Sequence, residues 1–456
     1  MIPSARGTRL EFGDFQTPLA FAREVTAHLA QQDFHPRSML EPTCGRGSFL
    51  LAALELFPQL ERAVGVDINS QYLSELHDAT RSDPRVSLIQ SDCFTTDWKV
   101  LLSSLPQPVL ILGNPPWVTS SRLGVLSSAN APEREAGAVK PGIEALTGKS
   151  NFDVSEWLLR RWIEAMEGVD ARLVMLVKTS VARRVMLQLP SNLGATIRPI
   201  AAKKHFGAEV SAGVFDVHAG GPQVLSFRGL LVANPNCFGK RATLAADPPT
   251  PWRSGIKHDA SKVLELIPLG GADYRNGLGE VVELEETYLF PLLKSSDLSR
   301  QATPTPRRTL LTTQRRPGEP TDQTSETAPR TSAYLQRHAA ILDARGSSIY
   351  KRAPRFGIFG VGPYSFSLWK VATSCLHKKL QFHAIGPHNG RPVVFDDTCA
   401  FMSFDEEETA MEAASLLNSQ PASEFLQSLI FWDSKRPITI EILRTLSINA
   451  LRDNQN

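Results

Sequence analysis

The sequence predicts an α/β chain, in which a doubly wound parallel sheet is followed by a mixed α+β region. Two observations carry this prediction. Between residues 37 and 178, short apolar runs alternate with segments of helical spacing, a pattern typical of a parallel sheet with helices on both faces. In addition, 456 residues suit two or three domains of ordinary size. We place the domains at residues 1–235 and 236–456.

The elements of the first domain follow one another in a regular order. Apolar runs predict strands at 38–40, 63–68, 86–89, 109–112 and 172–177. Helical spacing predicts helices at 48–57, 70–79 and 153–166. A Ser-, Ala- and Gly-rich stretch at 119–150 interrupts the alternation and is expected to be a functional loop.

The second domain carries weaker signals. Residues 299–335 are rich in Thr, Pro, Arg and Ser, which indicates a flexible linker or surface loop. Short aromatic strands are expected after this stretch, and helices after residue 406.

The composition is that of a globular chain, with 42% apolar and 21% charged residues. No apolar run reaches the roughly 20 residues that a membrane span needs. The five cysteines form no CxxC pair, so we expect neither a disulfide framework nor a zinc knuckle. We expect no metal in the site. A reducing cytoplasm is the expected location.

The net charge of +2 conceals an uneven distribution. Residues 300–380 hold 14 Lys or Arg and 4 Asp or Glu, an excess of 10, so the rest of the chain sums to 2 − 10 = −8. Such a basic segment fits a polyanionic partner, and it equally fits a solvated linker. The charge pattern alone leaves both readings open.

Three strand ends carry residues suited to a nucleoside cofactor. Gly45 and Gly47 follow the first strand, where the absence of side chains allows backbone to approach a ligand closely. Asp67 ends the second strand, and a carboxylate there can accept hydrogen bonds from ribose hydroxyls. Asp92 and Phe94 follow the third strand and suit an adenine amino group and its ring. Together they predict a nucleoside site at this edge of the sheet.

The fourth strand ends in Asn114-Pro115-Pro116-Trp117. Two prolines stiffen the backbone and remove two N–H donors. The Asn114 side-chain oxygen and the Pro115 carbonyl are then two acceptors, which suit an amino group with two hydrogens. Trp117 offers a flat surface on which a planar base can stack.

These motifs, in this order, resemble the gamma-class (TaqI-like) N6-adenine DNA methyltransferases, which use S-adenosylmethionine. A further motif of that group, Gly13-Asp14-Phe15-Gln16-Thr17-Pro18, precedes the Gly-rich turn. Thr17 could cap a helix that begins at Pro18. The resemblance covers about the first 220 residues. It implies a Rossmann-like catalytic domain at 1–235 and a target-recognition region at 236–456.

The resemblance also implies roles for individual residues. Thr17 and Glu41 would contact the methionine moiety of the cofactor, and Gly45 and Gly47 would form the turn beneath it. Asp67 would hold the ribose, and Ile68 would pack on the adenine. Asp92 would bind the adenine amino group, and Phe94 would flank the adenine ring. Asn114, Pro115, Pro116 and Trp117 would form the catalytic motif, Phe206 the second wall of the base pocket, and Asn151 part of a substrate-binding motif. Cys44 and Cys93 are expected to be packing residues.

The expected partner is double-stranded DNA, from which an adenine would be flipped for methylation. Arg307, Arg308, Arg315 and Arg316 are candidate phosphate contacts. The setting implied is restriction-modification or phage defence, with a separately encoded nuclease or defence subunits. Alternatives are methyl transfer to cytosine N4, RNA or a protein glutamine, and a catalytically idle DNA-specificity subunit.

Overall fold

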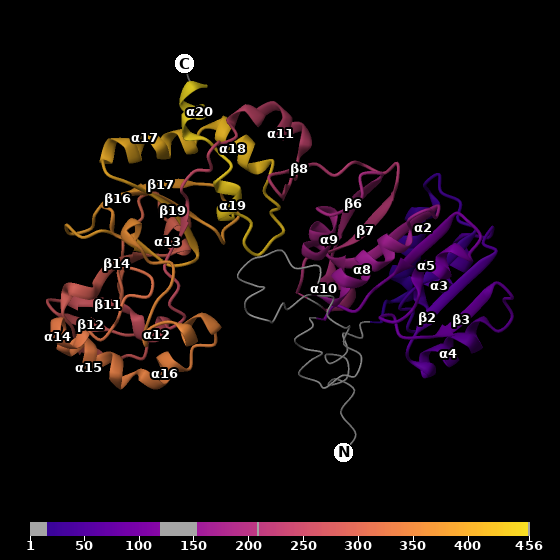
Figure 1. Ribbon diagram of the computed structural model, residues 1–456, viewed down its shortest axis with the longest axis horizontal. Helices are drawn as coiled ribbons and strands as arrows, with labels where there is room; N and C mark the ends of the chain where they lie inside the picture. The colour runs from indigo at the N-terminus through magenta and orange to yellow at the C-terminus, as the bar shows by residue number, and fades with distance from the viewer. Residues whose placement is uncertain (1–15, 119–152, 208, 455–456) are drawn as a thin grey trace. The chain divides into compact units, whose positions relative to one another are not determined.

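The computed structural model describes residues 16–118, 153–207 and 209–454, and its chain divides into two compact units, Met1–Leu231 and Val232–Asn456 (Figure 1). We call them unit 1 and unit 2. The division lies close to the boundary that we placed at residue 235, while the functional labels of the two regions stay predictions.

A seven-stranded sheet forms the centre of unit 1. Its strands are β1 (Ser38–Glu41), β2 (Arg62–Asp67), β3 (Val86–Gln90), β4 (Val109–Gly113), β5 (Ala171–Lys178), β6 (Leu193–Ile200) and β7 (Ala212–Ala219). The spatial order is β3-β2-β1-β4-β5-β7-β6. The first five strands pair in parallel, and β7 runs antiparallel to both β5 and β6. The predicted Rossmann-like, doubly wound class is therefore confirmed.

Helices cover both faces of this sheet. They are α2 (Leu19–Ala30), α3 (Ser48–Leu56), α4 (Ser70–Thr80), α5 (Trp98–Ser103), α8 (Val154–Ala165), α9 (Thr179–Met186) and α10 (Ala202–Phe206). Side chains of β4 alternate between two cores: Val109 and Ile111 pack with α5, α8 and α9, whereas Leu110 and Leu112 pack with α2 and α3. This period of two is what a strand buried on both faces requires. A small hairpin, β8 (Ser226–Phe227) and β9 (Leu230–Leu231), ends the unit.

Unit 2 contains two further sheets. The six-stranded sheet has the order β13-β12-β11-β15-β14-β18, with β11 (Glu265–Gly270), β12 (Asp273–Arg275), β13 (Val281–Glu283), β14 (Leu289–Leu293), β15 (Arg308–Leu311) and β18 (Val394–Phe395). The four-stranded sheet has the order β10-β19-β16-β17, with β10 (Arg253–Ser254), β16 (Trp369–Ser374), β17 (Phe382–Ile385) and β19 (Cys399–Phe404). Unit 2 is thus mixed α+β, as predicted.

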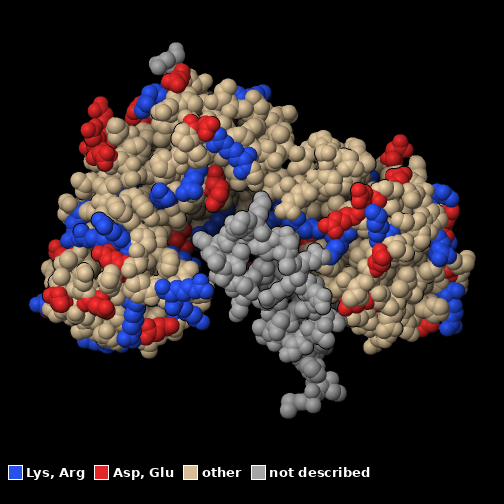
Figure 2. Space-filling model, viewed as in Figure 1, with Lys and Arg blue, Asp and Glu red and all other residues tan. Residues whose placement is uncertain are grey.

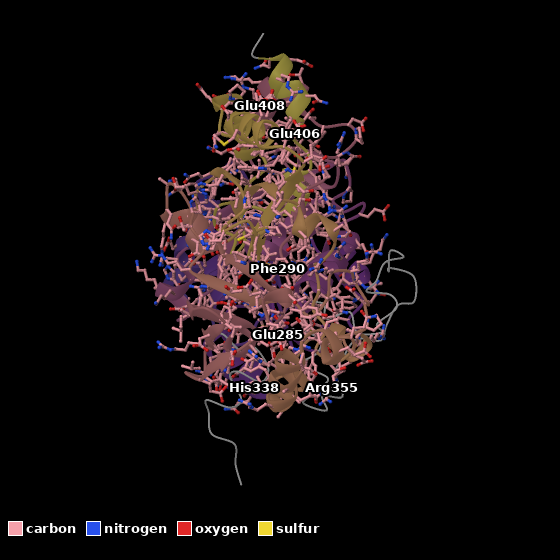
Figure 3. All side chains as sticks on the ribbon, turned by 90° about the vertical axis from the view of Figure 1, so that its left-hand side faces the viewer. Glu285, Phe290, His338, Arg355, Glu406 and Glu408 are labelled. Carbon is pink, nitrogen blue, oxygen red and sulfur yellow. The ribbon has the colours of Figure 1, made fainter. Side chains whose placement is uncertain are left out.

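Short helices pack around these sheets. They are α11 (Pro235–Arg241), α12 (Ser261–Leu264), α13 (Ser295–Arg300), α14 (Thr324–Thr327), α15 (Pro329–Arg337), α16 (Ala339–Asp343), α17 (Glu407–Leu417), α18 (Gln420–Gln427), α19 (Ile440–Leu443) and α20 (Ile448–Asp453). Glu285, labelled in Figure 3, accepts hydrogen bonds at the start of α15 from the backbone of Arg330 at 2.8 Å and of Thr331 at 2.9 Å. A carboxylate at this end stabilises the helix.

The stretch 299–335, expected to be flexible, contains regular structure: β15 and α14 lie within it, and most of α15 does. Its polar residues Thr312, Thr313 and Gln314 are buried. The Thr313 hydroxyl donates to the Phe356 carbonyl at 2.8 Å, and the Gln314 side-chain oxygen accepts from the Ile358 N–H at 2.9 Å. Polar residues can be buried where distant partners satisfy them, so composition alone misrepresented this stretch.

Candidate active site

The predicted cofactor and catalytic residues gather at one edge of the sheet in unit 1. β1 lies between β2 and β4, and the chain leaves it in opposite directions on its two sides, toward β2–β3 and toward β4–β5. This is the topological switch point, where open α/β sheets bind ligands beyond the carboxyl ends of their strands. The Gly-rich turn after β1 and the motif after β4 therefore face the same space.

The Gly-rich turn is fixed to the end of β2. The Gly45 N–H donates to Asp67 Oδ2 at 2.7 Å, and Asp67 Oδ1 accepts from the Asn69 N–H at 2.8 Å. Gly45 and Gly47 have positive φ angles of 52° and 73°, which favour glycine because a Cβ atom is strained there. The carboxylate of Asp67 is thus oriented by backbone on both sides.

Glu41, at the end of β1, is buried and turned toward α3. Its Oε2 accepts from the Leu50 N–H at 2.8 Å. Burial raises the pKa of Glu41 well above its ordinary value, against the effect of backbone hydrogen bonds from Leu50 and Phe49. Glu41 therefore anchors the first turn of α3 to β1, and its predicted contact with a cofactor stays a prediction.

The ends of β2 and β3 contribute further side chains to the same edge. Ile68, after β2, is 51% exposed, so its apolar side chain is open to solvent beyond the strand end. After β3, Asp92 Oδ1 accepts from the Phe94 N–H at 2.9 Å. The Phe94 ring packs against Trp157 of α8, with ring centroids 5.5 Å apart. Phe94 thus joins the end of β3 to α8.

Thr17 does not cap a helix, and that expectation is wrong. Helix α2 begins at Leu19, with Pro18 in the capping position and no side-chain hydrogen bond to the helix. The Thr17 hydroxyl instead accepts from Asn114 Nδ2 at 3.3 Å, and its carbonyl accepts from the Ser48 hydroxyl at 2.6 Å. Thr17 therefore links the segment before α2 to both the start of α3 and the Asn114 motif.

Trp117 and Phe206, distant in sequence, lie side by side. Their ring centroids are 6.0 Å apart at 52°. The indole N–H of Trp117 donates to the Leu176 carbonyl of β5 at 3.2 Å, and Phe206, the last residue of α10, packs edge-on against Phe21 at 5.6 Å. The two rings predicted to form the walls of a base pocket are thus neighbours.

Sequence reasoning assigned no site role to Lys178 or to Asp153, which lie beside this motif. Lys178 Nζ lies 3.4 Å from the Trp117 carbonyl and 2.7 Å from Asp153 Oδ2. A charged residue directly after the apolar run 173–177 of β5 was the available signal for Lys178. The predicted substrate residue Asn151 lies outside the described residues.

Neither cysteine near the site is suited to nucleophilic attack. Burial raises the pKa of the Cys44 thiol, assisted by the nearby carboxylates of Glu41 and Asp67. Burial, together with Asp92 and Asp67, raises the pKa of Cys93 to about 12. Since a thiolate is the reactive form, both residues fit a packing role.

The four candidate phosphate-binding arginines belong to unit 2 and differ from one another. Arg307, Arg315 and Arg316 are exposed. Arg308 instead pairs with Glu265 Oε2 at 3.4 Å. Burial opposes ionisation of Glu265, but hydrogen bonds from His258 and Lys294 outweigh it and lower its pKa to about 2. Arg308 is therefore part of an internal ion cluster.

Other arginines of the basic segment also have acidic partners. Arg330 pairs with Glu283, and Arg355, labelled in Figure 3, pairs with Asp343 at 2.8 Å. On the face viewed in Figure 2, Lys and Arg side chains lie among Asp and Glu side chains. The local charge excess is consequently smaller on the folded surface than in the sequence.

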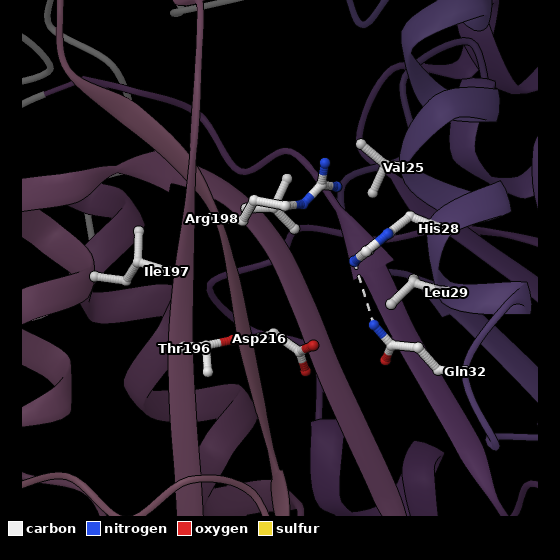
Figure 4. A pocket seen from close by; sticks show the side chains of 9 residues that line it. Val25, His28, Leu29, Gln32, Thr196, Ile197, Arg198 and Asp216 are labelled. Atoms are coloured by element: carbon white, nitrogen blue, oxygen red, sulfur yellow. Dashed lines mark hydrogen bonds between the residues drawn. The ribbon is translucent and has the colours of Figure 1, made fainter.

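A cavity of about 180 Å³ lies elsewhere in unit 1, between α2 and strands β6 and β7 (Figure 4). His28 and Gln32 contact each other there at 3.3 Å, and Asp216 pairs with Arg172 at 2.5 Å. None of the residues lining this cavity is among the predicted site residues.

Comparison with known proteins decides the family. No protein-family model matches the chain. It is, however, 39% identical over 477 residues to the type II methyltransferase M.NspV of Nostoc sp., and the similarity covers 99% of each protein. The chain belongs to the type II methyltransferases. Within the described residues, no helix has the length and apolar character needed to cross a bilayer.

Solved structures give weaker similarities. The type IIL restriction-modification enzyme MmeI in complex with DNA has a TM-score of 0.48 and 12% identity, over 98% of this chain and 75% of that one. The methyltransferase subunit of a type I restriction-modification system from Streptococcus thermophilus has a TM-score of 0.31 and 16% identity, over 45% of each chain.

Proposed function

We propose that the chain is a site-specific DNA methyltransferase that transfers the methyl group of S-adenosylmethionine to the N6 amino group of a flipped adenine, within a restriction-modification or phage-defence system. The observation that carries the proposal is the position of Asn114 and Trp117 at the switch point, with Phe206 beside Trp117. The whole-length similarity to a type II methyltransferase supports it.

The strand ends fit S-adenosylmethionine. The exposed side chain of Ile68 offers an apolar surface for an adenine ring, next to the oriented carboxylate of Asp67. The glycine backbone at 45 and 47 allows close approach of the methionine part. When bound, the cofactor would supply a methyl group on a sulfonium sulfur; as the new N–C bond forms, the C–S bond breaks, a neutral thioether leaves, and the methylated nitrogen gives up one proton.

The remaining chemistry is positioning. An exocyclic amine is a weak nucleophile, because its lone pair is delocalised into the ring. The Asn114 side chain and the Pro115 carbonyl would accept its two hydrogens and favour the pyramidal amine that attacks. Trp117 and Phe206 would hold the flipped base by stacking.

The test is transfer of a tritiated methyl group to double-stranded DNA, RNA and protein, followed by identification of the modified nucleoside. We expect N6-methyladenine in DNA. Label in N4-methylcytosine would overturn the adenine assignment, and label only in RNA or protein would overturn DNA as substrate. Cofactor binding without any incorporation would indicate an idle specificity subunit.

Asn114→Ala tests the role of the motif. We expect the methyl-transfer rate to fall about 10²–10³-fold, as when one stabilising group is removed from an active site, while cofactor affinity is kept. Asn192→Ala, at an exposed turn of the same unit, is the matched control. Near-normal transfer by the Asn114 variant would refute the assignment.

A further inference from the structure

The turn that follows β4 is poor in its own hydrogen-bond donors. Pro115 and Pro116 have no N–H group, so neighbouring groups must supply part of what fixes the backbone here. β5 does so twice. The Leu176 carbonyl accepts from the Trp117 indole at 3.2 Å, and Lys178 Nζ lies within 3.4 Å of the Trp117 carbonyl. The strand next to β4 therefore holds Trp117 by its side chain and by its backbone.

Lys178 is itself held in place. It is the last residue of β5, and its side chain is only 23% exposed. Asp153 Oδ2 contacts its ammonium group at 2.7 Å, and the Asp153 side chain is 9% exposed. Asp153 also caps α8, because its Oδ1 accepts from the Ser155 hydroxyl at 2.6 Å and from the Ser155 N–H at 3.2 Å. One carboxylate thus orients both the lysine and the helix.

The contacts close into a ring. The N–H of Val154, which follows Asp153, donates to the carbonyl of Val118, which follows Trp117, at 2.9 Å. Trp117 therefore contacts Lys178, and Lys178 contacts Asp153, which caps α8. The first residue of α8 in turn bonds to Val118, the residue after Trp117. A change at Lys178 would loosen the turn that carries the amine acceptors.

We propose that Lys178 is a positioning residue for methyl transfer, which acts through the Trp117 carbonyl to fix the conformation of the Asn114–Trp117 turn. This rests on the proposed function, since that turn is taken to hold the reacting amine. The competing explanation is purely structural. Removing one member of a buried ion pair leaves an uncompensated charge and destabilises a fold wherever the pair lies.

Four variants separate these explanations. Lys178→Met removes charge and donor, and Lys178→Arg keeps both. The double variant, Lys178→Met with Asp153→Asn, leaves no uncompensated charge. It still lacks the donor to the Trp117 carbonyl. Lys99→Met is the matched control, because Lys99 forms an exposed ion pair with Glu167 in the same unit, at 3.6 Å with side chains 60% and 84% exposed.

We expect kcat for DNA methylation to fall about 10²-fold in Lys178→Met, the loss typical of a small misplacement of reacting groups. KM for cofactor and DNA should change little, since no residue proposed to contact the cofactor or the DNA is replaced. The double variant should recover thermal stability yet remain slow, and Lys178→Arg should regain much of the rate. Lys99→Met should match the wild type. A double variant with wild-type kcat would overturn the proposal.

A second readout does not need DNA. In Lys178→Met, hydrogen exchange of the Val154 and Ser155 amides, which bond to Val118 and Asp153, should become faster than in Lys99→Met. Unchanged exchange would refute the positioning ring. Absence of DNA methylation by the wild type would instead refute the proposed function, so the two failures are distinguishable.

Discussion

Gly47 offers a quantitative test of the packing beneath the Gly-rich turn. Its φ angle is 73°, and a Cβ atom there would lie 2.5 Å from both Cδ atoms of Leu76 on α4. Gly168 has nearly the same φ, 77°, but a Cβ atom would meet nothing within 4 Å. An alanine at either position bears the cost of left-handed backbone, about 1–2 kcal/mol. Only Gly47→Ala adds overpacking, about 1–3 kcal/mol.

We therefore expect Gly168→Ala to lower the free energy of unfolding by about 1–2 kcal/mol and Gly47→Ala by about 2–5 kcal/mol. Both residues belong to unit 1, so urea unfolding of the full chain, followed by circular dichroism, compares them in one transition. The unfolded-state entropy lost by replacing glycine is the same for both variants and cancels in the difference.

A double variant tests the cause of the difference. Leu76→Ala alone should cost about 2–5 kcal/mol, because Leu76 is 1% exposed. Combined with Gly47→Ala, it should cost less than the sum of the two single changes, since the clashing atoms are gone. The reasoning fails if Gly47→Ala and Gly168→Ala agree within about 0.5 kcal/mol, the usual error of such comparisons.

Three further predictions concern charge. Burial raises the pKa of Glu41, so the folded chain keeps this proton to a higher pH than the unfolded chain, and the free energy of unfolding should fall as pH rises above 4.5. In urea titrations at several pH values, Glu41→Gln should flatten this fall. An equally steep fall in the variant would contradict the assignment to Glu41. Burial lowers the pKa of Lys370 from 10.5 to about 7, so the free energy of unfolding should rise with pH between these two values. Lys370→Met, measured by the same urea titrations, should abolish this rise. A rise that persists in the variant would exclude Lys370 as its source. Replacing Arg315 and Arg316 by alanine should lower DNA affinity and reduce the salt slope by about 2 at unchanged melting temperature, whereas Arg308→Ala should lower the melting temperature. Fluorescence anisotropy at several salt concentrations measures this slope, and an unchanged slope would mean that the exposed pair is only solvated.

The first five strands of unit 1 in the chain, β1 to β5, could be predicted because each contains a short apolar run that lies near helical segments. β6 and β7 could not. β6 (Leu193–Ile200) contains Gly194, Arg198 and Pro199 and lies at the sheet edge, where such residues are tolerated. Its pairing with β7 depends on a partner that local sequence does not reveal.

In the candidate site, too, some features could be predicted from the sequence and others could not. The glycines, Asp67 and the Asn114 motif follow strands directly, so strand prediction alone brings them to one edge. The contacts of Trp117 with Phe206 and Lys178 join residues far apart in the chain. The prediction of a flexible stretch at 299–335 failed for a related reason, since its buried polar side chains are satisfied by hydrogen bonds with residues after 350.

The ion cluster around Glu265 has a consequence for strand alignment in unit 2. Glu265 begins β11, Lys294 follows β14 and Arg308 begins β15, and both cations contact the one carboxylate. A slip of β11 by one residue would turn Glu265 to the opposite face of the sheet. Lys294 and Arg308 would then lose their ion pairs with the Glu265 carboxylate. Misaligned forms of the six-stranded sheet would lose these contacts, so the cluster favours the observed register of β11 with β15.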